Sequence, residues 1–246
     1  ETPCNPILRL TDIAAVAELA KSCGALLAVD STFATPVATQ PIKLGADFVI
    51  HSLTKYIGGH GDAVGGAIAG AATDIDEIRR KIGIRMGGVI SPFNAWLILR
   101  GAATLPIRMQ AHQASAIAVA HFLEQHPAIS NVTYPGLASH PQHELACRQM
   151  SNFSGTLTFQ VRDNAIPPKT FAEKLSTIHY AVSLGHHRSL LFYISTNEIL
   201  KTSFSLTESQ EANYRHYAGE AIYRLSVGIE APGDLCADLD NALREL

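Results

Sequence analysis

Residues 46–70 read ADFVIHSLTKYIGGHGDAVGGAIAG, in which a short apolar run leads into hydroxyl side chains, one lysine and a glycine-rich turn. The run at residues 48–50 is largely β-branched, which is typical of a strand covered on both faces. Ser52, Thr54 and Lys55 follow where that strand should end. The glycines after them can adopt positive φ angles and let the backbone approach a ligand closely. We therefore place the functional centre at Lys55, although an isolated lysine beside a turn is usually a surface residue.

The residues before this stretch alternate between predicted helices and strands. Thr11 is expected to cap an amphipathic helix, and the next apolar run is closed by Asp30. The expected order is helix, strand, short helix and strand, at residues 12–23, 25–30, 41–44 and 48–50. This order indicates an α/β fold, in which ligands bind beyond the carboxyl ends of parallel strands. Asp30 and Lys55 should therefore converge on one crevice.

The residues after the stretch extend the sheet and then change class. Residues 65–70 predict a further strand, and Thr73 with Asp76 and Asp74 with Glu77 are expected helix-start pairs. Residues 92–126 are rich in alanine and leucine, so two helices or one kinked helix are expected around Pro106. Further helices are predicted at 141–150, 170–178 and 234–246, and alternating strands at 155–161 and 221–229.

These patterns predict two domains. Residues 1–105 are expected to form part of an α/β domain, and residues 106–246 an α+β domain with an antiparallel sheet. The chain has 246 residues, of which 47% are hydrophobic, so it can bury a large core.

Composition narrows the class of partner. A net charge of −3, with acidic and basic residues interspersed, provides no basic field for nucleic acid, and no uninterrupted apolar stretch is long enough to span a bilayer. A small-molecule partner is expected, with neither nucleic acid nor membrane. The four cysteines are widely spaced, which argues against a zinc site or a disulfide framework and predicts a cytoplasmic location. The chain begins at Glu1 without an initiator methionine, so we expect it to be incomplete at its start.

The carboxylate and the amine at neighbouring strand ends have a specific use. Pyridoxal phosphate (PLP) enzymes hold the cofactor through a lysine Schiff base and set a carboxylate against the pyridine nitrogen. On this interpretation Lys55 bonds the aldehyde and Asp30 the ring nitrogen, while Ser52 and Thr54 supply hydroxyls to the phosphate. The hydroxyls could equally serve only to cap a turn.

Six blocks of the sequence resemble the Cys/Met-metabolism family of PLP-dependent enzymes, which includes methionine γ-lyase, the cystathionine enzymes and the homoserine-ester sulfhydrylases. The blocks, in order, are ETPCNP at 1–6, AVDSTFATP at 28–36, GADFVIHSLTKYIGGHGD at 45–62, SPFNAWLILRG at 91–101, YPGLASHPQHELA at 134–146 and RLSVGIE at 224–230. They cover nearly the whole chain. The resemblance implies the large domain of a fold-type I, aspartate aminotransferase-like enzyme, incomplete at its N-terminus, and a C-terminal α+β small domain.

The resemblance also implies roles for single residues. The cofactor ligands would be Lys55 as the Schiff-base lysine, Asp30, Ser52, Thr54, and Asn5 beside the phenolic oxygen. Arg224 would bind the substrate α-carboxylate, with Ser183 nearby. Alternation places Arg224 on one strand face with Ile222 and Ser226, where an ion pair is possible, although most arginines lie at the surface.

The substrate is indicated by the residue before Ser183. The cystathionine enzymes usually have glutamate there, whereas this chain has Val182, which suits a thioether or an ester leaving group. The expected reaction is α,γ-elimination from L-methionine to 2-oxobutanoate, methanethiol and ammonia. The alternative is γ-replacement, as in O-acylhomoserine sulfhydrylase or the cystathionine γ-synthases and lyases. Residues 186–206 depart from the family pattern, and Lys201 there could meet an acidic substituent or face solvent.

The resemblance implies a homodimer that builds its active sites across the interface, and a homotetramer overall. Family members carry an N-terminal part with the main phosphate turn, so residues 1–246 alone are expected to lack turnover.

Two other functions were weighed. His186 with His187, and His140 with His143, are close enough for a metal, but no cluster completes four ligands, so no metal is predicted. Gly59, Gly61 and Gly65 give GxGxxxG ahead of a strand, where a dinucleotide loop has GxGxxG ahead of a helix. A non-catalytic α/β protein that binds a nucleotide or a partner remains the remote alternative.

Overall fold

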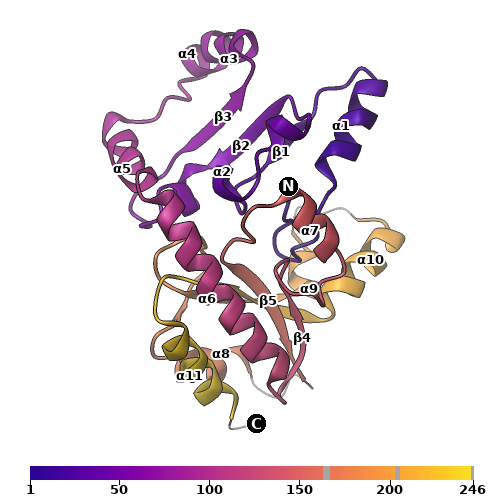
Figure 1. Cartoon of the computed structure of the whole chain (residues 1–246), viewed down its shortest axis with the longest axis vertical. Helices are drawn as coiled ribbons and strands as arrows, with labels where there is room; N and C mark the ends of the chain where they lie inside the picture. Colours follow the sequence, from indigo (N-terminus) through magenta and orange to yellow (C-terminus); the bar gives the residue numbers. More distant parts are fainter. Residues whose placement is uncertain (163–166, 203–205, 245–246) are drawn as a thin grey trace. The chain divides into compact units, whose positions relative to one another are not determined.

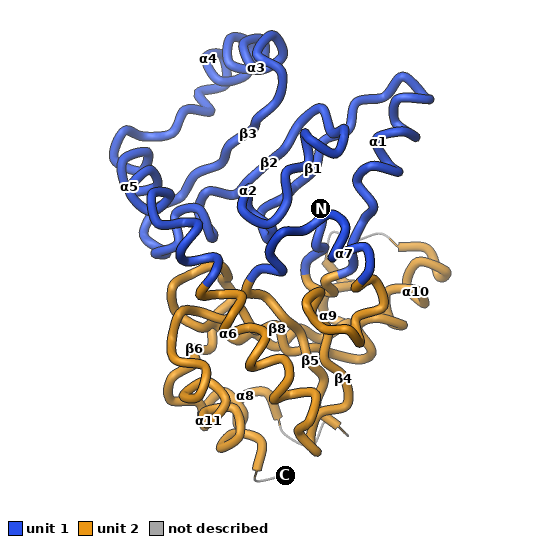
Figure 2. The backbone as a smooth tube through the Cα atoms, viewed as in Figure 1, with its two compact units in different colours: residues 1–5, 9–110, 144–154 blue, residues 6–8, 111–143, 155–246 orange. Residues whose placement is uncertain are grey.

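The computed structural model describes residues 1–162, 167–202 and 206–244, and the chain divides into two compact units (Figure 2). Unit 1 comprises Glu1–Asn5, Arg9–Gln110 and Glu144–Ser154, and unit 2 comprises Pro6–Leu8, Ala111–His143 and Gly155–Leu246. Each unit has its own sheet. The expected domains at 1–105 and 106–246 stay a prediction. Residues 203–205 of the divergent segment 186–206 and the last two residues of the predicted C-terminal helix lie outside the described residues.

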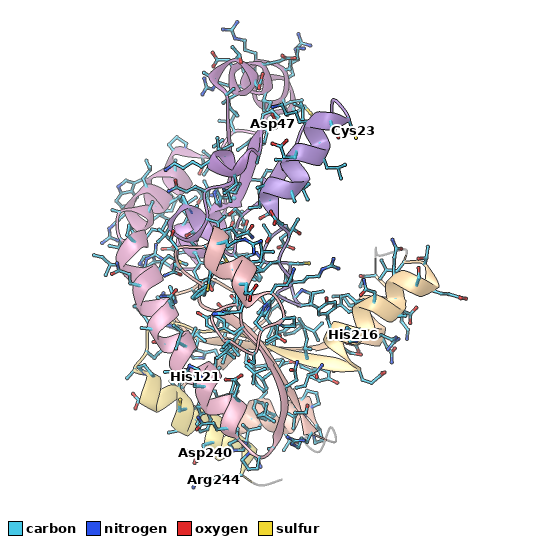
Figure 3. All side chains as sticks on the ribbon, turned by 45° about the vertical axis from the view of Figure 1, so that its right-hand side comes forward. Cys23, Asp47, His121, His216, Asp240 and Arg244 are labelled. Atoms are coloured by element: carbon cyan, nitrogen blue, oxygen red, sulfur yellow. The ribbon has the colours of Figure 1, made fainter. Side chains whose placement is uncertain are left out.

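Unit 1 contains a three-stranded sheet in the order β1-β2-β3 (Figure 1). Its strands are β1 (Ala28–Asp30), β2 (Phe48–Ser52) and β3 (Gly66–Gly70). Strands β1 and β2 are parallel and pair Asp30 with Ile50, while β3 runs antiparallel to β2. Asp47, labelled in Figure 3, accepts the N–H of Leu27 through Oδ2 at 2.7 Å, which aligns the two strands where they begin. The carboxyl ends of β1 and β2 therefore meet at one edge, as predicted.

The two faces of this sheet differ in burial. Val29 and Val49 lie on one face and are buried, and Val29 packs with Ala46 and with Ile13 of helix α1 (Ile13–Ser22). Ile50 lies on the opposite face and is 37% exposed. The expectation that this strand is covered on both faces is wrong for the described residues, because they cover only one.

Unit 1 contains several further helices. They are α2 (Thr35–Ala38), η1 (Pro41–Leu44), η2 (Leu53–Ile57), α3 (Ala72–Ile78), η3 (Arg79–Gly83), α4 (Ile84–Met86), α5 (Pro92–Ala102) and α7 (His143–Gln149), whose first residue lies in unit 2.

The predicted N-terminal caps of two helices are wrong. Asp12, not Thr11, caps α1 by accepting the N–H of Ala15 at 3.1 Å. Helix α3 begins after Ala71, so Thr73 lies inside it, where its hydroxyl bonds Asp74.

The predicted interruption near Pro106 is confirmed. Helix α5 ends at Ala102, and α6 (Leu105–Gln125) begins three residues later. Pro106 occupies the first turn of α6, where its missing N–H costs nothing. Ser91 caps α5 by accepting the N–H of Asn94 at 3.2 Å.

Unit 2 contains a five-stranded sheet in the order β4-β5-β8-β7-β6. The strands are β4 (Ile129–Thr133), β5 (Thr156–Val161), β6 (His179–Tyr180), β7 (Leu190–Ser195) and β8 (Ala221–Ser226), and the helices are α8 (Pro168–Lys174), α9 (Thr196–Ile199), α10 (Glu208–Ala218) and α11 (Pro232–Leu243). All pairs are antiparallel except β6 with β7. The antiparallel sheet predicted for the second half is therefore present.

Aromatic side chains fill the core of unit 2. Phe159 of β5 and Tyr223 of β8 are register partners whose rings stack with centroids 5.3 Å apart. Phe171 of α8 packs against Tyr223 at 5.0 Å. Burial raises the pKa of the Tyr223 phenol well above its usual range. These contacts fix β8, the strand that carries Arg224.

Among the described residues, no helix has both the length and the apolar character needed to cross a membrane.

Candidate active site

Asp30 ends β1, and its carboxylate is held by the turn that follows. The N–H of Thr32 donates to Asp30 Oδ1 at 2.9 Å. The hydroxyl of Thr32 in turn accepts the N–H of Ser52 at 2.8 Å. Thr32 therefore joins the end of β1 to the end of β2. Sequence reasoning missed Thr32, although an aspartate side chain often accepts the backbone N–H two residues further on.

The second carboxylate oxygen of Asp30 receives no hydrogen bond from any residue that the structure describes. A carboxylate with an unused acceptor at a strand end suits a protonated ring nitrogen. Asp30 is only partly buried, and it shares the less covered sheet face with Ile50, its register partner on β2, and with Ser52 two residues further along that strand.

Ser52 and Thr54 are used differently. The Ser52 hydroxyl makes no hydrogen bond to a described residue, so it is available to an anionic ligand; its N–H is the group that binds Thr32. The Thr54 hydroxyl accepts the N–H of Gly65 at 3.1 Å and donates to the carbonyl of Gly65 at 3.3 Å. Thr54 therefore joins the lysine turn to the start of β3, and a phosphate would have to compete for its proton.

Lys55 lies in η2, a single π-helical turn directly after β2. Its backbone, with φ −91° and ψ −133°, departs from helical geometry inside that turn. The turn is closed by two hydrogen bonds, from Gly58 N–H to the Leu53 carbonyl at 2.9 Å and from Gly59 N–H to the Lys55 carbonyl at 2.7 Å. Isolated π turns of this kind are frequent at functional sites. The structure thus places Lys55 one turn beyond the same strand ends as Asp30.

His51 lies on the opposite face of β2 from Ser52 and is 8% exposed. Burial lowers the pKa of His51, while the Asp30 carboxylate and the backbone of Ser31 oppose that shift. The net effect favours a neutral imidazole close to Asp30. Sequence reasoning did not single out this residue.

Asn5 lies in the N-terminal segment of unit 1. This segment reaches the end of β1, because the N–H of Thr2 donates to the Asp30 carbonyl at 3.2 Å. Asn5 is exposed, and its N–H donates to the Glu1 carboxylate at 3.0 Å. Its proposed contact with the cofactor stays a prediction.

The predicted substrate residues belong to unit 2. Arg224 of β8 is buried, and its Nη2 donates to the carbonyl of Val182 and, at 3.5 Å, to that of Ser183. The Ser183 hydroxyl lies 3.1 Å from His186 Nε2. The Val182 side chain is 67% exposed. The structure therefore brings Arg224, Val182 and Ser183 together within unit 2, as it brings Asp30, Ser52, Thr54 and Lys55 together within unit 1.

Of the two histidine pairs that could suggest a metal, His140 and His143 contact backbone carbonyls, while His186 contacts the Ser183 hydroxyl. His140 Nε2 lies 3.2 Å from the Leu8 carbonyl, and His143 Nδ1 lies 2.9 Å from the Pro135 carbonyl. Burial lowers the pKa of His140. Across the described ranges, no three His, Cys, Asp or Glu side chains are grouped so that they could hold a metal ion.

The donor set at the ends of β1 and β2 fits PLP. It offers a carboxylate with an unused oxygen at Asp30, an uncommitted hydroxyl at Ser52 and an amine at Lys55 in the next turn. These are the groups that the ring nitrogen, the phosphate and the aldehyde require.

Comparison with known proteins agrees with this chemistry. The model of the family described as "Cys/Met metabolism PLP-dependent enzyme" matches residues 1–244. O-succinylhomoserine sulfhydrylase of Pseudomonas aeruginosa is 44% identical to the chain, covering 100% of it and 59% of that protein. Cystathionine γ-synthase of Mycobacterium bovis is 43% identical, covering 99% of the chain and 60% of that protein. The chain thus spans about 60% of the length of these curated relatives.

A solved structure shows the same fold. Apo methionine γ-lyase of Micromonospora echinospora superposes with a TM-score of 0.86 at 35% identity, covering 99% of this chain and 62% of that one. On the family match along nearly its whole length, the chain belongs to the Cys/Met metabolism family of PLP-dependent enzymes.

Proposed function

We propose that the chain supplies the cofactor lysine and the substrate-binding arginine of an enzyme that carries out γ-elimination or γ-replacement on sulfur amino acids or homoserine esters. One observation carries the proposal. Asp30 and the segment from Ser52 to Lys55 occupy the adjoining ends of two parallel strands, joined by Thr32. The proposal concerns the natural full-length protein, since this chain spans about 60% of its relatives.

Bound PLP would supply an electron sink for charge that develops at the substrate α-carbon. Asp30 would keep the ring nitrogen protonated through its unused oxygen. Lys55 would hold the cofactor and, once released by the substrate amine, would move the proton from the α-carbon. Lys55 is partly buried in the turn after β2. Ser52 would bind the phosphate.

Arg224 would orient the substrate. A guanidinium binds a carboxylate through two parallel hydrogen bonds, which fixes the direction of the amino acid as well as its position. Arg224 also contacts the carbonyls of Val182 and Ser183, so its guanidinium is held next to the segment in which Val182 exposes an apolar side chain. We propose that Val182 contributes to selection of the distal group.

The specific reaction we propose is α,γ-elimination from L-methionine, because an apolar residue at position 182 offers nothing to a charged distal group. γ-Replacement is the second candidate, and it is favoured by the names of two relatives, an O-succinylhomoserine sulfhydrylase and a cystathionine γ-synthase. The two reactions share the loss of the γ-substituent. They differ in whether the remaining amino acid fragment is then hydrolysed or captured by a thiol.

We further propose that unit 1 is the C-terminal portion of a fold-type I cofactor domain and unit 2 is the C-terminal small domain. The less covered face of the β1-β2-β3 sheet supports this, since Ile50 and Ile68 there are 37% and 46% exposed. A preceding segment of the full-length protein would cover that face.

A homodimer, assembled into a homotetramer in the cytoplasm, is proposed for the whole protein. Phe93, Trp96 and Leu99 recur along α5 at helical spacing and are 65%, 59% and 72% exposed. An apolar stripe of this kind is typical of an interaction surface. Light scattering on the full-length protein and on Trp96→Glu should show a smaller species for the variant; a monomeric parent would contradict the proposal.

The reaction is tested with the full-length protein and a panel of L-methionine, L-cystathionine and O-acylhomoserines, with and without added thiol. Formation of 2-oxobutanoate and methanethiol from methionine supports the elimination that we propose. Thioether products from O-acylhomoserine and thiol, without methionine cleavage, would select replacement. A colourless protein that takes up no PLP would reject both and leave the nucleotide- or partner-binding alternative.

A further inference from the structure

We propose that Arg108 is a positioning residue for Lys55, because it holds the backbone of the turn that presents the lysine. The inference rests on the proposed role of Lys55 and adds a residue that lies 53 positions further along the sequence. Arg108 is in the first turns of α6, within unit 1.

The guanidinium of Arg108 connects three segments of unit 1. Nη1 donates to the carbonyl of Tyr56 at 2.7 Å, and Nη2 donates to the carbonyl of Ile57 at 3.2 Å. Nη2 also donates to the carbonyl of Gly101 at 2.8 Å, and Nε donates to the Thr104 hydroxyl at 3.0 Å. The first two acceptors are the carbonyls that directly follow Lys55. The other two belong to the end of α5 and the link to α6.

These acceptors explain why a buried arginine is tolerated. Arg108 is 6% exposed, and none of its partners among the described residues is a carboxylate. Burial lowers the pKa of its guanidinium. The carbonyls of Tyr56 and Ile57 lie at the end of η2, and that of Gly101, which also accepts the N–H of Thr104 at 3.2 Å, lies at the end of α5. All three therefore carry part of the negative end of a helix dipole. A cation with a fixed fork of donors satisfies them together.

The glycines around the turn are shaped to this contact. A Cβ on Gly59, whose φ is +75°, would lie 2.2 Å from Nη1 of Arg108. A Cβ on Gly101 would lie 2.1 Å from the carbonyl oxygen of Gly58. The missing side chain at Gly59 makes room for the guanidinium, and the missing side chain at Gly101 lets α5 approach the lysine turn directly. The glycines after Lys55 therefore do more than permit a bend.

The contact acts on Lys55 because it fixes the backbone on the C-terminal side of the residue. On the N-terminal side, Leu53 N–H donates to the Gly65 carbonyl at 2.9 Å. Lys55, with its non-helical ψ of −133°, lies between these two anchors. Loss of the C-terminal anchor frees the carbonyls of Tyr56 and Ile57 and lets the direction of the lysine vary.

The test is amide hydrogen exchange, read by mass spectrometry, in the full-length protein without cofactor. Arg108→Met keeps an unbranched side chain of similar length and removes every donor. We expect the amides of residues 53–59 to exchange on the order of tenfold to a hundredfold faster, since three carbonyls lose a charged donor. The control is Arg148→Met, which removes an exposed arginine of unit 1 that pairs with Asp12 and should leave these amides unchanged.

A second readout separates positioning from support of the fold. With cofactor and substrate, Arg108→Met should lower kcat about tenfold and leave KM within about twofold, because Lys55 and not substrate binding is disturbed. Uniformly faster exchange throughout unit 1, or unchanged exchange at residues 53–59, would overturn the inference. If Arg108→Met does not fold, Gly59→Ala displaces the guanidinium from the other side and must give the same local exchange. A parent protein that binds no PLP would refute the proposed function, while the exchange result would still decide whether Arg108 holds the turn.

Discussion

Within the described residues, both faces of the unit 2 sheet are buried in its central strands, whereas one face of the unit 1 sheet is partly exposed. In the central strands of unit 2, residues on both faces are buried, from Ile222 to Ser226 in β8 and from Thr156 to Phe159 in β5. In unit 1, Val49 is buried while its neighbour Ile50 is 37% exposed. The residues proposed to bind the cofactor lie at the edge of the less covered sheet, whereas Arg224, proposed to bind the substrate, is buried in the covered one. The difference teaches that unit 2 has a core of its own, while unit 1 leaves one face of its sheet partly exposed within the described residues.

The largest effect is expected where unit 2 is most tightly packed. Phe159→Ala removes a ring that stacks on Tyr223 and packs near Phe171, so unfolding in urea should require about 3–5 kcal/mol less free energy. Leu19→Ala, on the exposed side of α1, is the control and should change stability by less than about 0.5 kcal/mol. Equal losses for both variants would remove the distinction between the units.

The next effect concerns the function of the covered sheet. Arg224→Gln removes the charged fork, so kcat/KM for the amino acid substrate should fall on the order of a hundredfold, mainly through KM. Arg188→Gln changes an exposed arginine of the same unit and should leave steady-state kinetics of the full-length enzyme unaltered. An unchanged KM in the first variant would reject Arg224 as the carboxylate anchor.

A smaller and pH-dependent effect is expected at Asp238 of α11. Burial raises the pKa of this carboxyl, but hydrogen bonds from the backbone of Ser176, Thr177 and Ile178 and from the Ser176 hydroxyl outweigh it, so the pKa is lowered overall. The folded protein therefore binds this proton less readily than the unfolded chain. The stabilisation is present above the unfolded pKa, near 4, and is lost as pH falls through the lower folded pKa.

Asp238→Asn should accordingly cost about 2 kcal/mol at pH 7 and much less at pH 2–3. The measurement is urea unfolding of unit 2, followed across that pH range. Asp234→Asn, at an exposed position of the same helix, is the matched control. A loss that does not depend on pH would show that the carboxylate charge is not what holds residues 176–178.

The smallest effect is expected on the less covered face of unit 1. Ile50→Ala in residues 1–246 should cost less than about 1 kcal/mol, whereas Val49→Ala, one residue away on the buried face, should cost about 2 kcal/mol. In the full-length protein the cost of Ile50→Ala should rise toward that of Val49→Ala, because a preceding segment would bury it. An unchanged small cost in both forms would mean that this face stays exposed.

The site of unit 1 could be predicted because strand order alone brings its residues together. Asp30 and Lys55 each follow a short apolar run, and parallel pairing places the ends of those runs at one edge. The role expected of Arg224 came from the family resemblance, and the alternation of its strand only placed it on one face with Ile222 and Ser226. Thr32 and Arg108 were not found, because their partners are backbone atoms that a sequence pattern does not display.

The first residues of some helices, and the presence of some helices and strands, could not be predicted from the sequence. Thr11 and Asp12 are both good N-cap residues, and only tertiary contacts decide between them. The Thr11 N–H donates to the Thr2 hydroxyl, and the Thr11 carbonyl accepts from the Gln149 side chain. Strand β7 and helix α10 were not predicted, since they lie in or beside residues 186–206, where the sequence departs from the family pattern.

The most direct test of the account is to identify the lysine that holds the cofactor. The full-length protein is loaded with PLP and reduced with borohydride, which fixes any lysine-bound cofactor irreversibly, and its peptides are mapped by mass spectrometry. We predict a pyridoxyl phosphate adduct on Lys55 that is absent from Lys55→Ala, together with loss of the visible absorption band in that variant. An adduct on another lysine, or a visible band that persists in Lys55→Ala, would contradict the account.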